Sequence, residues 1–428
     1  MRTHVQRLGR AALVIVLCGA CGSTSRALHT NARARPPAEA STTQSAAVGS
    51  IPYAEAWREA AQRFRSGGAW SGADGAYSIA LGPTRVLWLF ADTFIDPSAD
   101  GSRENGPNQF IRNSVAIQSG LDANSAHDLA RSSMTFHWRT NPAGTAHSFF
   151  ADIDTSERWV WPLHGTRLAD GTLLLFRMQV VHSTAAFGFA IDGWDAVAID
   201  DPMQEPERWQ PRSVAAVSRS LGRLIGSSVL VHGEFLYAYA VEDQARQHAV
   251  FVVRWPLAAL RGLSPKALSD PEWYTQRGFV AQHALSKDTE PSVLFADGQV
   301  EFSVHYDAAR ARFVEIQMAG LFVSDPRTQL VMRTAARPEG PWSPPTAFYR
   351  PPEHALPNAR DLAAYAGKAH PEQLGGDLVT YVVNDVTKPT PSDAVYYPQT
   401  LRLRYRPAAN SGTHAGTSPA TPPAPVAP

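Results

Sequence analysis

The chain has 428 residues, and its 39 Lys and Arg balance 39 Asp and Glu, so the formal net charge at pH 7 is zero. A neutral chain argues against nucleic acid as the partner, because a nucleic-acid-binding protein needs a basic face. Aromatic residues make up 10% of the chain. Since aromatic faces stack on the apolar faces of sugar rings, this composition favours a neutral polymer such as a glycan as the partner.

The first 21 residues have the pattern of a bacterial export signal. Three arginines precede an apolar run at 11–17, and small residues stand directly before Cys21. This pattern predicts a lipoprotein signal peptide at 1–21 with lipid attached to Cys21, and the alternative is plain secretion. We expect an exported lipoprotein of the bacterial cell envelope that touches the membrane only through its lipid anchor. Both cysteines lie in this segment, so the exported body has no disulfide.

Composition divides the rest of the chain into three parts. Residues 22–50 are rich in Ser, Thr and Ala and predict a flexible linker, and residues 407–428, rich in Pro and Ala, predict a disordered tail. Residues 51–406 are expected to form one folded domain, which we expect to be monomeric.

The first β-hairpin of this domain ends in two aspartates. In residues 74–81, small or polar residues alternate with apolar ones, as they do in a strand. A Gly-Pro turn then leads into a second, mostly apolar stretch at 86–92. An antiparallel hairpin with this turn sets Asp74 opposite Asp92, with their Cβ atoms roughly 4.5–5.5 Å apart. Two carboxylates this close have different pKa values, as acid-base or nucleophilic chemistry requires. The alternative interpretation is that each Asp only accepts hydrogen bonds from the backbone at a strand end.

Four further strand-turn-strand units follow, each with a Gly-containing turn. They cover residues 159–176, 224–240, 290–306 and 366–384. Five such units predict an all-β fold, a five-bladed β-propeller of the glycosidase-like type with its active site at one end of the central channel. A β-sandwich or a β-helix is the alternative, but neither predicts a paired inner hairpin in every repeat.

The hairpin registers bring a set of polar and aromatic residues to one rim of the channel. The predicted rim comprises Asp74, Asp92, Trp161, Glu242, Asp243, Glu290, His305, His370 and Asn384.

Paired carboxylates are what glycoside hydrolysis requires, one protonated and one ionised. We predict Asp74, Asp92 and Glu290 as catalytic residues, and Glu242 as a residue that binds substrate. A pair on one hairpin suits the short, retaining separation, whereas a pair from blades across the channel suits the inverting one. The sequence leaves this choice open.

The remaining candidates are predicted to bind substrate. Arg112 and Asn113 could orient the acidic pair or serve loop packing, and Trp161 could form a sugar platform or belong to the core. His305, His370 and Asn384 could hydrogen-bond sugar hydroxyls, with core histidines as the alternative. No run of residues has the spacing of a metal site or a cofactor motif, so we expect no metal and no cofactor.

Several stretches resemble one known family. Residues 73–78, 87–94 and 111–114, followed by 290–293, 340–343, 370–372 and 380–384, are similar to the DUF4185-type five-bladed propellers. That family includes bacterial endo-D-arabinofuranosidases that act on mycobacterial arabinan. The resemblance implies that Asp74 and Asp92 are the catalytic carboxylates, although Ala91 stands where the family pattern more often has glycine.

Together these features predict a glycoside hydrolase that acts on a cell-envelope or environmental polysaccharide, furanose-containing and D-arabinan-like. The alternatives are a glycan-binding propeller lipoprotein without catalytic activity and a structural scaffold of the envelope.

Overall fold

A computed structural model describes residues 50–100, 102–103, 106–120, 128–150, 157–184, 188–242 and 248–407. The predicted signal peptide with Cys21, the linker up to residue 49, the predicted rim residue Asp243 and the tail from residue 408 lie outside these ranges. The described part holds one α-helix, α1 (Arg58–Arg65), and is otherwise built from strands joined by loops and short 3₁₀ helices. Within that part, no helix is long and apolar enough to cross a membrane.

Five antiparallel sheets of four or more strands make up the described fold, each with its strands ordered from the channel outward. The first contains β2 (Trp70–Gly82), β3 (Arg85–Ile95), β5 (Ser114–Ser119) and β6 (Ser133–His137), with β4 (Gln109–Ile111) also paired to β3. The second contains β9 (Arg158–Arg167), β10 (Leu173–His182), β11 (Phe189–Ile199) and β12 (Arg212–Ser218). The third contains β13 (Arg223–His232), β14 (Phe235–Glu242), β15 (His248–Pro256), β16 (Glu272–Thr275) and β17 (Gly278–Ala281), with β18 (Phe295–Gly298) also paired to β15.

The fourth sheet contains β19 (Ser303–Asp307), β20 (Arg312–Ala319), β21 (Gln329–Ala335) and β22 (Thr346–Tyr349). The fifth contains β23 (Leu362–His370), β24 (Leu378–Asp385), β25 (Gln399–Pro407) and β1 (Ser50–Ala56). A separate small hairpin of β7 (Arg139–Thr140) and β8 (Ala146–His147) lies between the first and second sheets in the chain.

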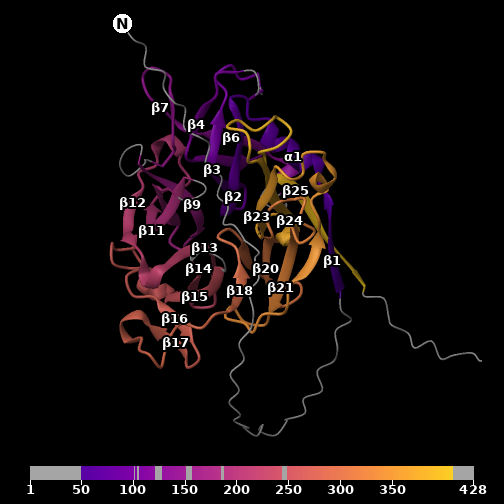
Figure 1. Cartoon of the computed structure of the whole chain (residues 1–428). Coiled ribbons are helices and arrows are strands. Elements are labelled where there is room, and N and C mark those ends of the chain that lie inside the picture. Colours follow the sequence, from indigo (N-terminus) through magenta and orange to yellow (C-terminus); the bar gives the residue numbers. More distant parts are fainter. Residues whose placement is uncertain are drawn as a thin grey trace, which may run out of the picture.

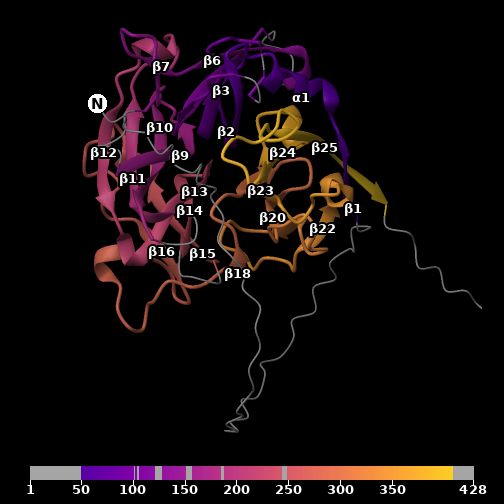
Figure 2. The ribbon, with the colours of Figure 1, turned by 45° about the horizontal axis from the view of Figure 1, so that its top comes forward.

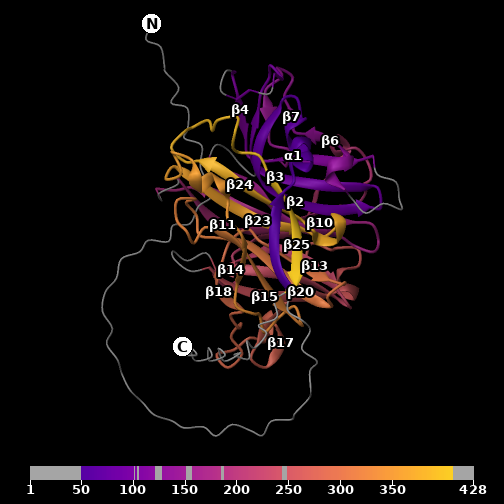
Figure 3. The same cartoon turned by 90° about the vertical axis from the view of Figure 1, so that its right-hand side faces the viewer.

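The five innermost strands form a ring. Contacts run from β2 to β9, β13, β19 and β23, and from β23 back to β2, and the sheets radiate from this ring in Figures 1 and 2. This arrangement is the predicted five-bladed β-propeller. The ring closes because β1, from the start of the described chain, pairs with β25 near its end, as Figure 3 shows from the side. Closure of this kind protects the last sheet from an exposed edge.

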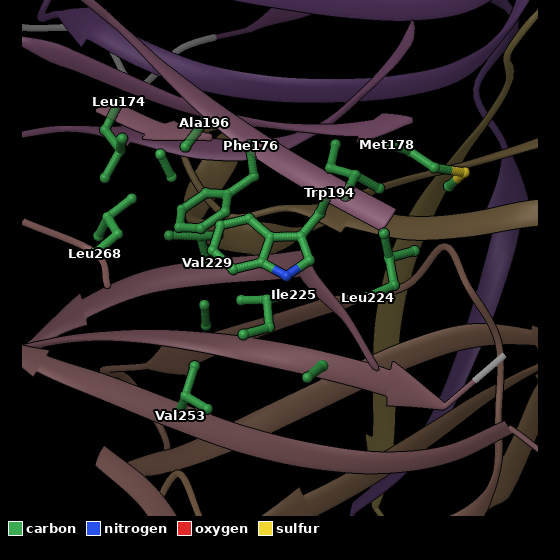
Figure 4. Close-up of a cluster of buried hydrophobic side chains, with 14 of the residues drawn as sticks. Leu174, Phe176, Met178, Trp194, Ala196, Leu224, Ile225, Val229, Val253 and Leu268 are labelled. Carbon is green, nitrogen blue, oxygen red and sulfur yellow. The ribbon is translucent and has the colours of Figure 1, made fainter. Parts of the chain in front are cut away.

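The hydrophobic core lies between neighbouring blades, because each sheet is covered on both faces. Between the second and third sheets, Phe176 and Trp194 pack against Ile225 and Val229 (Figure 4). Phe176 and Ile225 are fully buried. Burying one such side chain contributes about 1.5–3 kcal/mol, so contacts of this kind fix each blade against the next.

The predicted fourth hairpin, 290–306, is wrong. Residues Phe295–Gly298 form β18 and pair with β15 at the third sheet, and the inner hairpin of the fourth sheet is β19–β20. The Asp-Gly pair at 297–298 looked like a turn, but Gly298 is needed because a Cβ there would meet Val250 and the carbonyl oxygen of His248. The true turn contains no glycine, and Ala311 adopts the positive φ of 49° instead.

Four of the five inner strands carry a register shift partway along their length. In β2 the shifts include those between Ala73 and Tyr77, in β13 the shift falls between Ile225 and Ser228, and in β23 it falls between Tyr365 and Lys368. In β9 the shift lies opposite residues Leu175–Arg177 of the neighbouring strand β10. Extra residues in one strand of a pair re-aim the side chains around them and often occur beside functional sites. The inner strands therefore present side chains to the channel that a regular strand would direct elsewhere.

Candidate active site

Asp74 and Asp92 lie side by side in the first blade. The register pairs Ala73 with Thr93 and then shifts before Gly75 pairs with Phe90, so both aspartates occupy the irregular part of the hairpin. Their exposed fractions are 1% and 0%. Gly75 has φ of +85°, and a Cβ there would lie 3.0 Å from the backbone nitrogen of Ala91, so a glycine at 75 allows the two strands to approach at the acidic pair.

Asp92 is surrounded by donors. The indole Nε1–H of Trp161 donates to Oδ1 over 2.7 Å, and Nη1 of Arg112 lies 3.4 Å from each carboxylate oxygen. The guanidinium of Arg112 also stacks 4.0 Å above the ring of Trp159. Such charge-assisted bonds stabilise the ionised form of a carboxyl group. Trp161 is 1% exposed, and in this structure it positions Asp92 instead of offering an open face.

Asp74 has the opposite environment. The hydroxyls of Tyr365 and Tyr396 donate to its Oδ2 over 2.9 and 3.2 Å, while Oδ1 is buried without a hydrogen-bond partner among the described residues. Burial raises the pKa of Asp74 well above its ordinary value, and the charges of Asp92 and Glu301 raise it further against the two tyrosine hydrogen bonds. One carboxyl group with a pKa raised by burial therefore stands beside one that accepts a hydrogen bond from an indole and faces a guanidinium group.

Four residues of this centre were missing from the sequence prediction. Besides the two tyrosines, they are Glu301 and Lys368, whose Nζ lies 2.9 Å from Glu301 Oε1. Lys368 is buried and its Nζ lies 4.2 Å from the centroid of the Tyr77 ring. Glu301 stands two residues before β19, so a correct placement of that strand would have brought it to the channel mouth. No local pattern marks Tyr396, which reaches the site from the loop before β25.

His370 lies deeper in the channel than predicted. It is opposite Leu378, near the turn of its hairpin, whereas Asn384 is opposite Ala363 at the other end. These two residues therefore do not share the rim, and the prediction that they do is wrong because β23 begins at Leu362, four residues earlier than expected. Nδ1 of His370 lies 2.5 Å from Ser78 Oγ and Nε2 lies 2.8 Å from Thr380 Oγ1.

His305 and His164 lie near His370, since the charges of both contribute, after burial, to lowering the pKa of His370. Burial lowers the pKa of His164 and of His305 to about 4 and that of His370 well below its ordinary value. In His164, Nδ1 accepts a hydrogen bond from the Val229 backbone over 2.9 Å. These histidines are neutral groups in the interior. Asn384 is also buried, and its Oδ1 has no partner within the described residues.

Glu242 is the last residue of β14, and Glu290 lies in the segment between β17 and β18. Glu242 is opposite Arg223 in the third sheet, and both glutamates act on the charge of Arg223, whose pKa burial lowers. Glu290 is exposed and lies outside the strands. The expected place of Glu290 at the start of an inner strand was wrong because it depended on the fourth hairpin, and the charges that act on Asp74 come from Asp92 and Glu301.

Asn113 holds the loop that leads into the second blade. Its Nδ2 donates to the carbonyl oxygens of Phe150 and Val160, and its Oδ1 accepts from the Phe150 backbone over 2.7 Å. The amide is thus occupied by loop packing, while its neighbour Arg112 faces Asp92. In the part of the chain that the structure describes, no three His, Cys, Asp or Glu side chains gather in a way that could hold a metal ion.

Solved structures with a similar chain path include a Bacteroides ovatus protein to which hydrolase activity has been assigned provisionally. It is 17% identical, the match covers 82% of this chain and 90% of that one, and the TM-score is 0.57. The catalytic domain of a Coprinopsis cinerea α-L-arabinofuranosidase is 12% identical over 78% and 90% of the two chains, with a TM-score of 0.39. A Cellvibrio cellulosa α-L-arabinanase mutant is 11% identical over 78% and 91%, with a TM-score of 0.38. At these identities the first likeness shows a shared fold.

None of the curated proteins matches this sequence. The resemblance to DUF4185-type propellers remains a prediction, because the family model that matches is a different one. That model, described as Domain of unknown function (DUF5005), covers residues 60–408, and the chain belongs to this family.

Proposed function

We propose that this protein is a glycoside hydrolase in which Asp74 is the proton donor and Asp92 the neighbouring carboxyl group. The observation that carries the proposal is the contrast between them. Asp74 is buried, with a raised pKa, while Asp92 accepts from Trp161 and faces Arg112. Glycosidic bond cleavage needs one carboxyl group that keeps its proton at working pH to protonate the leaving oxygen. Glu290 is exposed and lies outside the strands, and we propose no catalytic role for it.

The proposed substrate is a neutral, furanose-containing polysaccharide similar to D-arabinan. Its support is the zero net charge of the chain and the resemblance of the stretches around Asp74 and Asp92 to the arabinan-cleaving propellers. The provisional hydrolase assignment of the Bacteroides ovatus protein is in keeping with this class of reaction.

A glycan-binding protein without catalytic activity is the second candidate. It is favoured by the exposed fractions of the two aspartates, 1% and 0%, because a group that transfers a proton to substrate must be reachable. A binding site would need only the surrounding channel mouth.

The test is a screen of the full chain against arabinans, galactans and other envelope glycans, with released reducing ends and binding measured in parallel. A hydrolase releases new reducing ends from at least one glycan, and the Asp74→Asn variant binds that glycan but releases none. Binding without release by the wild-type protein would select the second candidate, and neither binding nor release would contradict both.

We also propose that the protein is a cell-envelope lipoprotein anchored through Cys21, as its first residues suggest. Cys21→Ser should then move it from the membrane fraction to the soluble fraction of cells. An unchanged distribution would favour ordinary secretion.

A further inference from the structure

The charges of two carboxyl groups, Asp92 and Glu301, act on Asp74, and the three groups are not equally accessible. Asp74 and Asp92 are 1% and 0% exposed, and both belong to one hairpin of the first blade. The side chain of Glu301 is 12% exposed and comes from the segment that leads into β19 in the fourth blade. Glu301 is therefore the most exposed of the three carboxyl groups, and it comes from a different blade than Asp74.

The charge of Glu301 acts both on Asp74 and on a tyrosine that contacts Asp74. It raises the pKa of Asp74 and of Tyr365, which donates to Asp74. Its Oε1 lies 2.9 Å from Nζ of Lys368. Burial lowers the pKa of Lys368, and the charges of Glu301 and Asp74 act against that lowering. Asp74, Lys368 and Glu301 thus form one electrostatic unit built from the first, fifth and fourth blades.

Lys368 has little freedom to move within this unit. It is 1% exposed, its Nζ lies over the ring of Tyr77, and the hydroxyl of Tyr77 donates to the Ser227 carbonyl in the third blade over 3.0 Å. The bulge at Tyr365–Lys368 in β23 sets this direction. The ammonium group accordingly holds the Glu301 carboxylate at a fixed place.

Resting on the proposed function, we propose that Glu301 is the second reacting carboxylate of this centre, a general base that Lys368 positions. In the step, Asp74 gives its proton to the glycosidic oxygen as the bond from that oxygen to the anomeric carbon breaks. A water oxygen attacks the anomeric carbon from the opposite side, and Glu301 takes the proton of that water. Glu301 then releases its proton to solvent and Asp74 regains one from solvent, and the product sugar has inverted configuration. Asp92 acts as a positioning residue that keeps Asp74 protonated.

The experiment compares the full-length wild-type chain with Glu301→Gln and Glu301→Ala. Glu272→Gln serves as the matched control, because Glu272 is also paired with a basic residue, Arg254 at 2.6 Å, but lies on the outer strand β16. On the glycan that the wild-type chain cleaves, Glu301→Gln should lower the rate about 10²–10⁴-fold and Glu272→Gln should not. With Glu301→Ala, added azide should restore turnover of 4-nitrophenyl arabinofuranoside and yield the glycosyl azide.

A near wild-type rate for Glu301→Gln would overturn the proposal while leaving the proposed function intact. Loss of rate without azide rescue would also overturn it, since that result indicates a structural role. Because Glu301→Gln leaves Lys368 buried without its ion partner, the double variant Glu301→Gln, Lys368→Met keeps the test valid if the single variant unfolds.

Infrared spectroscopy provides a readout that needs no substrate. The band of the protonated Asp74 carboxyl group, assigned by its loss in Asp74→Asn, should titrate at lower pH in Glu301→Gln and stay unmoved in Glu272→Gln. An unmoved band in Glu301→Gln would overturn the proposal even if the chain is an active hydrolase. A chain that cleaves no glycan but shows the shift would contradict the proposed function, and with it the catalytic role of Glu301.

Discussion

Asp74 and Asp92 are the same residue type in opposite surroundings, and their difference is expected to decide the activity. Asn has nearly the same shape as Asp but cannot ionise or give up a proton, so Asp74→Asn and Asp92→Asn should each lower the rate of hydrolysis about 10²–10⁴-fold. Binding of the glycan should change little. Hydrolysis rates and binding isotherms on the same glycan check this, and near wild-type rates in both variants would mean that the pair is structural.

The raised pKa of Asp74 also has a consequence for stability. Between its ordinary value of 3.8 and its raised value, the folded protein keeps the proton that the unfolded chain has already lost. Stability from this group is therefore full at low pH and falls as pH rises through this window. Asp74→Asn should become more stable relative to wild type as pH increases. Melting temperatures of both proteins from pH 4 to 8 test this, and a constant difference would contradict it.

Trp161 links the second blade to the acidic centre through one hydrogen bond to Asp92. Trp161→Phe keeps most of the packing but removes the N–H donor to a charged group, a change of about 1.5–3 kcal/mol. We expect a lower melting temperature together with a rate of hydrolysis reduced more than tenfold. Trp159→Phe provides the comparison, because Nε1 of Trp159 has no hydrogen-bond partner among the described residues.

At the level of elements, the bulge in β13 depends on Gly226, which has φ of +115° and whose Cβ would overlap Phe176 of the second blade. Gly226→Ala should destabilise the protein by about 2–4 kcal/mol, from the positive φ and from overpacking. In the turn of the same hairpin, Gly233 also has a positive φ of +57° but open space around it, so Gly233→Ala should cost only about 1 kcal/mol. Denaturant unfolding of both variants measures the difference, and equal losses would show that overlap with Phe176 is relieved.

The layer of neutral histidines in the channel predicts sensitivity to acid. The pKa values of His164 and His305 are lowered to about 4, so between pH 6.5 and 4 the unfolded chain binds protons that the folded protein does not. Stability should fall as pH drops through this window, by at most about 3 kcal/mol per histidine. His305→Gln should flatten this slope, measured in the Asp74→Asn background to remove the opposing effect of Asp74. The exposed His283 gives the control, His283→Gln, and an equal slope in both would contradict the account.

The strands themselves were largely predictable, whereas their long-range partners were not. The alternation around Gly-Pro and Asp-Gly turns located the hairpins of the first, second and third blades, because turn chemistry and side-chain period are local properties. The prediction of the fourth hairpin was wrong because residues 295–298 pair with β15 instead. A pairing partner some 45 residues away leaves no local signal in the sequence. Glu301, Lys368 and Tyr396 were missed for the same reason, since tertiary packing alone brings them to Asp74.

At the level of the whole molecule, the ring depends on β1, which completes the fifth sheet. Deleting residues 1–56 exposes the edge of β25 and should lower the melting temperature and promote aggregation. Deleting only residues 1–49, which keeps β1, should do neither. Thermal melts and light scattering on the two truncated proteins check this, and equal behaviour would show that the other blades close the ring without β1.

The pairing of Ser50 with Pro407, at the end of the β1–β25 pair, also determines how the protein responds to mechanical load. A force that draws the two ends of the domain apart acts on one backbone pair at a time, as when a zipper is opened, so the bonds of β1 and β25 do not share the load. Such a geometry yields at lower force than strands sheared along their length. If the chain is tethered to a membrane through Cys21 while a glycan held at the channel mouth pulls on the body, the tension reaches residue 50 first. The β1–β25 pair of the fifth blade would then give way before any other strand pair of the propeller.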